Sequence, residues 1–254
     1  MISSLADNPS RREASSCQLG GPPITTAFQP IVDFELGEIE SYEALVRGVK
    51  GEPPSAIFAG VSGEDLYQLD DRCRRVAVGW AAELGLTARL NLNCSPVAIA
   101  KYPGLFFDLF DEAERLGLNR RQLVLEITER ETINDNQRFA KTIDRFRREG
   151  VTIAVDDFGA GFSGLALLAT MQPDILKLDM KLLRGIGSHG PRQAIVRATM
   201  SVCFDLGIDV LAEGVETMDE LEWCRDEGIE LFQGYLLGRP ALESLPDVDL
   251  GSLE

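Results

Sequence analysis

The sequence predicts an α/β fold: a modified TIM-type (βα)8 barrel with one antiparallel strand near the N-terminus. Short apolar runs alternate with helical patterns along nearly the whole chain, which indicates parallel βαβ units. Eight of these runs resemble strands, and 254 residues is a typical length for one closed barrel. Only a turn at Leu36-Gly37 separates the first two strands, so we expect them to form an antiparallel hairpin.

The expected strands are short and rich in apolar or β-branched residues. They span 28–34, 39–48, 89–93, 123–128, 151–157, 175–179, 208–213 and 231–236. The expected helices carry apolar residues at helical spacing, and several end at a glycine. They span 64–85, 104–116, 135–149, 165–170, 191–206 and 217–228.

The two ends differ in composition from the predicted barrel of residues 23–242. Residues 1–22 are Ser-rich, lack the apolar stretch of a secretory signal, and are expected to be a disordered leader. Residues 243–254 form an acidic tail, for which a solvated end is the simplest expectation. No apolar run approaches the roughly 18 residues of a membrane span, so we expect no membrane insertion and a cytoplasmic location.

Composition excludes several classes of function. A formal net charge of −16 argues against binding to nucleic-acid polymers or anionic membranes. The five cysteines show no CxxC spacing, so neither a disulfide framework nor a zinc knuckle is indicated. The single histidine, His189, excludes metal sites built on several histidines and has no neighbours that suggest a Ser-His-Asp triad. Any metal site would therefore use oxygen ligands, which favours Mg²⁺ or Mn²⁺.

Nearly every predicted strand after the first ends in a polar or charged residue. These residues are Glu43, Asn93, Glu126, Asp156 with Asp157, Lys177 with Asp179, Glu213 and Gln233. A buried carboxylate costs several kcal/mol unless it is paired or bound to a metal. Barrel enzymes place their reactive groups at the carboxyl ends of the strands. The pattern therefore predicts an acidic, oxygen-lined metal centre at one mouth of the barrel.

The adjacent carboxylates of Asp156 and Asp157 could serve two metal ions, one residue bridging and one terminal. Paired divalent ions about 3.5–4 Å apart suit in-line hydrolysis of a phosphodiester. Lys177 could orient the attacking water or neutralise phosphate charge. Arg47 is a candidate phosphate clamp, or a simple partner for a neighbouring carboxylate. The Gly-rich segment 158–164 suits a mobile flap over the site.

Seven motifs in order resemble those of the EAL-domain cyclic di-GMP phosphodiesterases. They are EALVR at 43–47, NCSP at 93–96, EITE at 126–129, DDFGAGFSGL at 156–165, KLD at 177–179, AEGVET at 212–217 and QGYLLGRP at 233–240. The resemblance covers residues 28–240. The EAL tripeptide alone would be a weak signal, whereas the ordered set is specific.

The resemblance implies hydrolysis of cyclic di-GMP to linear pGpG with Mg²⁺ or Mn²⁺, on a barrel that is often a homodimer. The implied ligands of the first metal are Glu43, Asn93, Glu126 and Asp156, and those of the second are Asp156, Asp157 and Glu213. The implied catalytic set is Lys177, which would contact the attacking water, with Glu43, Asp157 and Glu213.

The same resemblance implies supporting roles around these ligands. The expected substrate-binding residues are Gln29, Arg47 and Gln233. Glu129 would steady the DDFGAG loop and link metal binding to dimer contacts, and Glu216 would support the site. Phe162 and Gly164 stand where the family often has Tyr and Ser, which we expect to alter loop packing and not the chemistry.

Several alternatives stay open. Asp179 could brace Lys177 through an ion pair or take part in catalysis, and Glu216 could be a first-turn acid favoured by its helix dipole. A different class of function is a catalytically silent EAL domain that binds cyclic di-GMP or a protein partner. Another barrel hydrolase of phosphodiesters is disfavoured because many of these use histidine. An unidentified sensor or signalling partner is also expected.

Overall fold

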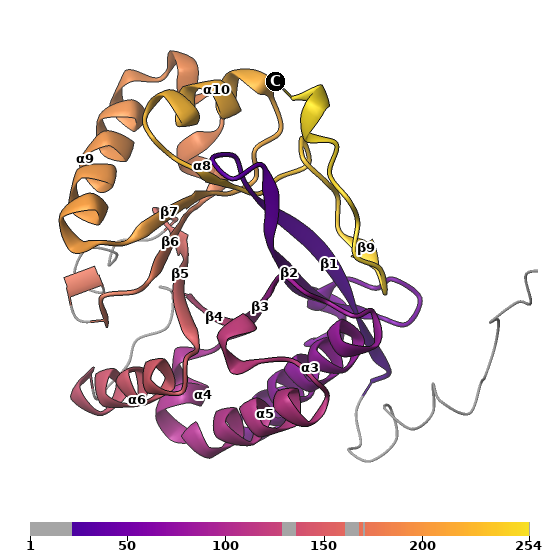
Figure 1. Ribbon diagram of the computed structural model, residues 1–254. Coiled ribbons are helices and arrows are strands. Elements are labelled where there is room, and N and C mark those ends of the chain that lie inside the picture. Colours follow the sequence, from indigo (N-terminus) through magenta and orange to yellow (C-terminus); the bar gives the residue numbers. More distant parts are fainter. Residues whose placement is uncertain (1–21, 129–135, 161–167, 170, 254) are drawn as a thin grey trace, which may run out of the picture.

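A computed structural model describes residues 22–128, 136–160, 168, 169 and 171–253 (Figure 1). Within them, eight strands close into a barrel with helices around the outside. The strands are β1 (Ile24–Asp33), β2 (Glu38–Gly48), β3 (Arg89–Cys94), β4 (Leu123–Thr128), β5 (Thr152–Phe158), β6 (Ile175–Leu178), β7 (Asp209–Ala212) and β8 (Leu231–Phe232). The predicted α/β barrel is confirmed.

Strand β1 closes the barrel and is antiparallel to both of its neighbours in the ring. Strands β2 to β8 are hydrogen-bonded in sequence order and parallel, and β1 pairs antiparallel with β8 on one side and β2 on the other. The β1–β2 hairpin turns through Gly37, whose φ of +67° suits glycine and whose N–H donates to the carbonyl of Asp33. The single antiparallel strand near the N-terminus is therefore also confirmed.

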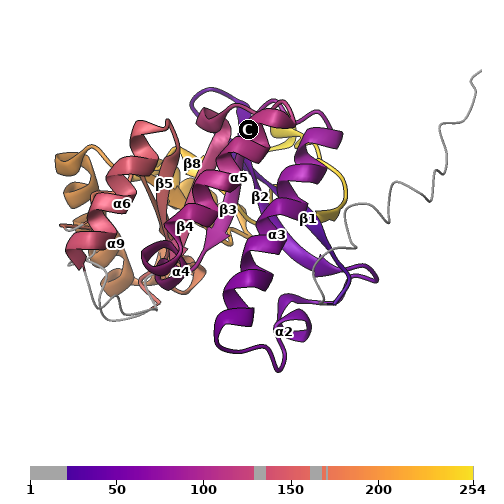
Figure 2. The same cartoon turned by 90° about the horizontal axis from the view of Figure 1, so that it is seen from below.

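The longer helices pack against the outer wall of the barrel (Figures 1 and 2). The helices are α2 (Pro54–Ile57), α3 (Glu64–Glu83), α4 (Pro96–Lys101), α5 (Pro103–Arg115), α6 (Asn136–Arg148), α8 (Met180–Leu183), α9 (Gly190–Leu206) and α10 (Met218–Asp226). Between helices and strands lies the main core, in which Phe106, Phe107 and Phe110 of α5 make ring contacts with Phe146 of α6. Of the expected helix 165–170, residues 168 and 169 are helical, and the others lie outside the described residues.

A second, small apolar cluster fills the inside of the barrel and fixes which side chains form the layer beyond it. Its members are Ile31, Val124, Ala154, Ile175, Leu211 and Leu231. Side chains alternate along a strand, so the residue two positions further along each strand points to the same interior. In chain order those residues are Gln29, on the reversed strand β1, and Glu126, Asp156, Lys177, Glu213 and Gln233. The apolar floor thus sets the position of a polar layer above it.

The eighth strand is shorter than predicted, which corrects the expected range 231–236. Strand β8 ends at Phe232, and the chain then turns toward the loop that follows β7. The N–H of Val215 donates to the carbonyl of Gln233, and the N–H of Leu236 donates to the carbonyl of Val215. Gly234 lies so close that an added Cβ would be 2.0 Å from the Val215 carbonyl oxygen. This close approach holds residues 234–237 against the loop that follows β7.

The acidic tail is not simply a solvated end, as the sequence suggested. A short ninth strand, β9 (Ala241–Leu242), pairs with β1 outside the ring. Beyond it, the hydroxyl of Tyr42 donates to the carbonyl of Pro246 at 2.9 Å. Leu253 is buried against the core, and further apolar tail residues, Leu245, Val248 and Leu250, pack on it. The apolar residues of the tail therefore bind to the barrel.

The leader of residues 1–22 falls outside the described residues except for its last residue. Among the helices that the structure describes, none is at once long and apolar enough to cross a bilayer.

Candidate active site

The polar layer receives one side chain from each of the eight strands or from the residue directly after it. They are Gln29 (β1), Glu43 (β2), Asn93 (β3), Glu126 (β4), Asp156 (β5), Lys177 (β6), Glu213 (after β7) and Gln233 (after β8). All eight were predicted as site residues. The hydrogen bonds and ion pairs described below join them into one network.

The ammonium group of Lys177 is the centre of this network. Its Nζ lies 2.6 Å from Glu213 Oε1, 2.7 Å from Glu126 Oε1, 3.2 Å from Asp156 Oδ1 and 3.9 Å from Glu43 Oε2. Lys177 is 1% exposed and Glu126 is fully buried. One cation thus faces four carboxylates in a region with little water, where electrostatic interactions are strong.

The pKa values follow from this crowding. Burial raises the pKa of Glu126 to about 8, since the opposing effect of the Lys177 ammonium is too small to offset it, and Glu43 and Asp156 raise it further. Burial also raises the pKa of Glu213, and neighbouring carboxylates add to this. For Lys177, burial lowers the pKa, but the surrounding carboxylates raise it well above its usual value. The lysine therefore stays charged, while Glu126 and Glu213 bind protons more readily than in water.

Amide side chains orient Glu43 at the edge of the network. The Nδ2 of Asn93 donates to Glu43 Oε1 at 2.9 Å, and the Nε2 of Gln233 donates to Glu43 Oε2 at 2.7 Å. Gln233 Nε2 also lies 3.3 Å from Gln29 Oε1, and Gln29 Nε2 donates to the carbonyl of Gly238 at 3.0 Å. Glu43 is thereby fixed at both oxygens.

The sequence reasoning missed one member of the site, Asn91. Its Nδ2 donates to Glu126 Oε1 at 2.8 Å, and the residue is buried. Asn91 lies two residues before Asn93 on β3, so strand alternation places both on the inner face. That alternation was a signal available in the sequence.

Asp157 follows Asp156 at an irregularity in the barrel wall. Its φ is +59°, in the left-handed region that a non-glycine residue seldom adopts, and the β5–β6 register shifts between Val155 and Phe158. In a regular strand the side chains of Asp156 and Asp157 would face opposite sides. The irregularity interrupts this alternation where the sequence places two adjacent carboxylates.

The donor chemistry of the network suits a divalent cation. Four carboxylates face one ammonium, and Glu126 Oε2 and Asn91 Oδ1 are buried oxygens with no hydrogen-bond partner among the described residues. Oxygen ligands of this kind are preferred by Mg²⁺, Mn²⁺ and Ca²⁺. In the described part of the chain no three acidic, Cys or His side chains are arranged as a metal site, and the carboxylates are gathered on Lys177 instead. The polar layer thus fits a divalent cation in its charge and in the type of its ligand atoms.

A cavity of about 310 Å³ borders this network on the side of Glu43 and Asn93. It lies between the β2–β3 wall and helices α2 and α3. Pro54 and Phe58 supply apolar surface, and Asp70 and Arg74 supply charged groups.

Comparison with known proteins identifies the family. The family model for the EAL domain matches residues 17–240. The chain is a member of the EAL-domain family. This EAL domain is 36% identical over 248 residues to the blue light- and temperature-regulated antirepressor BluF of Escherichia coli K12, and the match covers 96% of this chain and 61% of BluF. It is 32% identical over 223 residues to the cyclic di-GMP phosphodiesterase NbdA of Pseudomonas aeruginosa, covering 84% of this chain and 28% of NbdA.

Solved structures give the same result. A standalone EAL protein of Vibrio cholerae O395 in its cyclic di-GMP-bound form has a TM-score of 0.87 and 38% identity, covering 93% of this chain and all of that one. A manganese and cyclic di-GMP complex of Klebsiella pneumoniae BlrP1 has a TM-score of 0.84 and 39% identity, covering 91% of this chain and 59% of BlrP1. The EAL domain therefore spans only part of BlrP1, BluF and NbdA.

The remaining predicted residues of the EAL domain have other surroundings. Asp179 accepts a hydrogen bond from the N–H of Lys181 at 2.7 Å and caps α8, and it is not among the four carboxylates within 4 Å of Lys177 Nζ. Arg47 Nη1 donates to the carbonyl of Val46 and has no acidic partner among the described residues. Glu129 lies outside the described residues.

Glu216 belongs to a clamp on the loop after β7 and not to the Lys177 network. It is exposed, and its Oε1 is 2.9 Å from Arg184 Nη2. The main acid of this clamp is Glu220, which accepts hydrogen bonds from the N–H groups of Gly185 and Glu216, both at 3.0 Å, and from Arg184. Arg184 also donates to the carbonyl of Gly214 at 3.3 Å, next to Glu213. Glu220 thus holds the loop that carries Glu213.

We expect Lys177→Met to destabilise the metal-free chain by about 3–5 kcal/mol, because four carboxylates lose their shared cation. The loss of unfolding free energy should be smaller at pH 5 than at pH 8, since Glu126 and Glu213, whose pKa values are raised, take up protons at the lower pH. Urea unfolding in the presence of a chelator measures both effects. Lys181→Met removes the same charge from an exposed position and serves as the control. Equal stability of the two variants at pH 8 would contradict the central role of Lys177.

Glu220→Gln tests the loop clamp through pH. Burial raises the pKa of Glu220, but hydrogen bonds from the N–H groups of Glu216 and Gly185 and the charge of Arg184 outweigh it and lower the pKa below its usual value. An acid with a lowered folded pKa stabilises the fold above its unfolded pKa, and this contribution is lost as pH falls through the folded pKa. At pH 7 the variant should lose about 1.5–3 kcal/mol of unfolding free energy, the usual value for hydrogen bonds to a charged group.

The difference in unfolding free energy between Glu220→Gln and the unchanged chain should become smaller when urea unfolding is repeated below about pH 4.5, the region where an unperturbed Glu titrates. The control is Glu222→Gln, an exposed neighbour on α10. If the loss of unfolding free energy in Glu220→Gln did not depend on pH, the charge of Glu220 would not be what stabilises the loop after β7.

Proposed function

We propose that this EAL domain is a divalent-cation-dependent phosphodiesterase that hydrolyses cyclic di-GMP to linear pGpG. The observation that carries the proposal is the acidic network around Lys177, at the carboxyl ends of the barrel strands. Support for the substrate comes from related EAL structures with cyclic di-GMP bound, and from NbdA. A manganese complex of BlrP1 supports the choice of a divalent ion.

In this proposal two Mg²⁺ or Mn²⁺ ions are held by residues of the polar layer. Glu43, Asn93, Glu126 and Asp156 would hold one, and Asp156, Asp157 and Glu213 the other. Bound ions of this kind polarise a phosphoryl oxygen and make a nearby water more acidic. Glu126 Oε2 is buried and has no hydrogen-bond partner within the described part of the chain, which supports a ligand role for that residue.

The protein's own groups would then position the reactants. Lys177, raised in pKa and fully charged, would orient the attacking water and stabilise negative charge that develops on the phosphoryl group. Gln233 and Asn93 keep both oxygens of Glu43 fixed, so the carboxylate needs little reorganisation during the reaction.

The substrate would lie across the barrel mouth. Arg47 follows Glu43 by four residues on β2, so both side chains are on one strand face, and its guanidinium could pair with a phosphate. Gln29 and Gln233 complete the proposed binding set. The neighbouring cavity of about 310 Å³ is large enough for part of a nucleotide.

The test is to incubate the purified chain with cyclic di-GMP and Mn²⁺ or Mg²⁺ and to follow pGpG by chromatography. Glu43→Ala should lower the rate by at least about 100-fold, the upper range for loss of a group that supports a metal site. A chelator should abolish turnover. Glu38→Ala, the same change at an exposed position of β2, should leave the rate unchanged. Intact cyclic di-GMP in the presence of metal would refute the hydrolase.

A silent EAL domain is the second candidate, because BluF, a relative at 36% identity, is named an antirepressor. In that case the chain would bind cyclic di-GMP or a protein partner without turnover. A binding titration with cyclic di-GMP, together with the turnover assay, separates the two functions. Both proposals place the chain in the cytoplasm, with a sensor or signalling partner.

We further propose that the domain forms a homodimer through α9. Ile195, Val202 and Leu206 recur at helical spacing on one exposed stripe of this helix. Val202→Glu should shift the chain from dimer to monomer in sedimentation velocity, because a charge would enter the apolar contact. Ser201→Glu, on the adjacent exposed position, is the matched control. A monomeric unchanged chain would contradict the dimer.

A further inference from the structure

We propose that Arg74 is a positioning residue for Asn93 and that it acts from the outer side of the barrel wall. The inference rests on the proposed function, in which Asn93 is a metal ligand and orients Glu43. Arg74 is a buried residue of α3. It stands on the side of the helix that faces the barrel, where residues are normally apolar.

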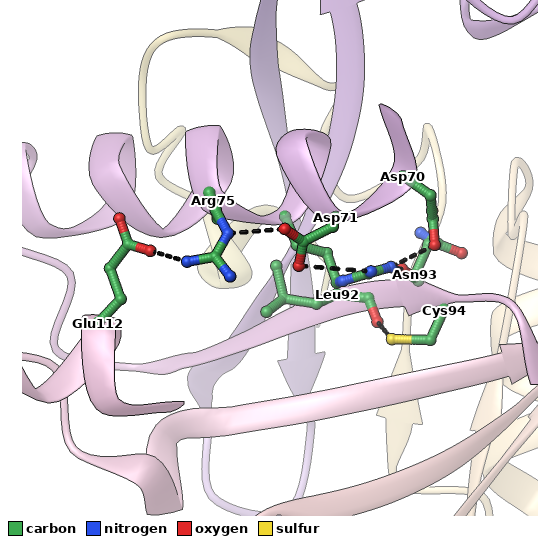
Figure 3. A network of polar contacts seen from close by, with 8 residues as sticks. Asp70, Asp71, Arg75, Leu92, Asn93, Cys94 and Glu112 are labelled. Carbon is green, nitrogen blue, oxygen red and sulfur yellow. Dashed lines mark hydrogen bonds and ion pairs between the residues drawn. The ribbon is translucent and has the colours of Figure 1, made fainter. Parts of the chain in front are cut away.

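The guanidinium of Arg74 is buried between α3, α5 and the end of β3. Arg74 is 3% exposed, and its carbon Cζ lies 4.6 Å from the centre of the Phe106 ring. Nη1 donates to the backbone carbonyl of Asn93 at 3.3 Å and to the carboxylate of Asp70. Figure 3 shows Asp70 and Asp71 on α3 facing Asn93 and Cys94 on β3. Arg74 Nη1 therefore links α3 to the end of β3 at Asn93, the candidate metal ligand.

The surroundings keep this cation charged and in place. Burial lowers the pKa of Arg74, but Asp70 and Asp71 raise it above its usual value. Asp71 Oδ1 is 3.9 Å from Arg74 Nη2, while Asp71 Oδ2 accepts a hydrogen bond from Arg75, which also pairs with Glu112 of α5 (Figure 3). Asp71 is thus held between Arg74 and Arg75. Arg74 Nε and Nη2 have no hydrogen-bond partner among the described residues, so Nη1 makes the directed contacts.

The contact is transmitted directly to the acidic network. The carbonyl of Asn93 receives the Arg74 hydrogen bond, and the side chain of the same residue donates to Glu43 Oε1 at 2.9 Å. A shift at the end of β3 would therefore move two proposed ligands together. Groups that orient metal ligands typically change metal affinity by about 10–100-fold when they are removed. Arg74 would set ligand geometry without touching metal or substrate.

The neighbouring arginine provides a matched control. Arg75 lies on the same helix and pairs with Asp71 and Glu112, and among the described residues it has no hydrogen bond or ion pair with Asn93. Arg74→Met and Arg75→Met thus remove the same charge from adjacent positions of one ion-pair cluster. Loss of the shared ion pair with Asp71 would affect both variants, whereas loss of the hydrogen bond to Asn93 would affect only the first.

The experiment measures Mn²⁺ binding by the full chain in the absence of substrate, from the electron paramagnetic resonance signal of free Mn²⁺. We expect Arg74→Met to weaken binding by about 10–100-fold and Arg75→Met to leave it within about 2-fold. Asn93→Ala should weaken binding as well, and the double variant Arg74→Met/Asn93→Ala should lose less than the two single changes together, because both act through one ligand. Unchanged Mn²⁺ affinity in a folded Arg74→Met chain would overturn the proposal.

Two further measurements cover the remaining outcomes. If Arg74→Met does not fold, Asp70→Asn/Arg74→Met removes the ion pair without leaving the Asp70 carboxylate unpaired, and Mn²⁺ affinity equal to that of Asp70→Asn would overturn the proposal. If the unchanged chain binds no Mn²⁺, the proposed metal site fails. Hydrogen exchange of the backbone amides of residues 89–95 in the full, metal-free chain then tests the role of Arg74. Faster exchange in Arg74→Met than in Arg75→Met supports that role, and equal exchange refutes it.

Discussion

The ion pairs of Lys177 are the interaction on which the barrel mouth depends. Four carboxylates approach one another more closely than their charges would allow without a cation between them. A buried ammonium offsets part of that repulsion and leaves an excess of negative charge. The same excess that makes the site costly in the metal-free protein would attract divalent ions. Stability and ligand binding are therefore opposed at this site, as is common for functional centres.

Closure of the barrel is what brings these groups together. Every strand contributes at least one polar side chain, and the groups that meet are far apart in the sequence, as with Glu43 and Asn93 or Glu43 and Gln233. The reversed strand β1 completes the ring and delivers Gln29 beside Gln233. Because β1 and β2 have no helix between them, the chain end packs there instead, through the contacts of β9 with β1 and of Tyr42 with Pro246. The tail thus belongs to the domain.

Support for the site comes from outside the barrel as well as from within. Glu220 and Arg184 fix the loop that carries Glu213, while Arg74 holds the end of β3. Both use buried or partly buried charged groups that bind backbone atoms of the segment next to a proposed ligand. Burying these charged groups is unfavourable because they lose hydration, but their hydrogen bonds fix the positions of the proposed metal ligands. These hydrogen bonds explain why charged residues stand at helix positions that face the barrel.

The sequence by itself determined the fold class, the one antiparallel strand and seven of the eight polar residues of the inner layer, because the ends of successive strands meet in one ring when the barrel closes. The eighth, Gln29, came from the family resemblance. The alternation of side chains along β3 was a signal for Asn91. The tertiary structure alone decided where β8 ends, where the tail packs, that Arg74 holds the end of β3, and that Glu220 holds the loop after β7. These depend on backbone groups meeting across more than 15 residues of intervening chain, and composition or periodicity carries no record of such contacts.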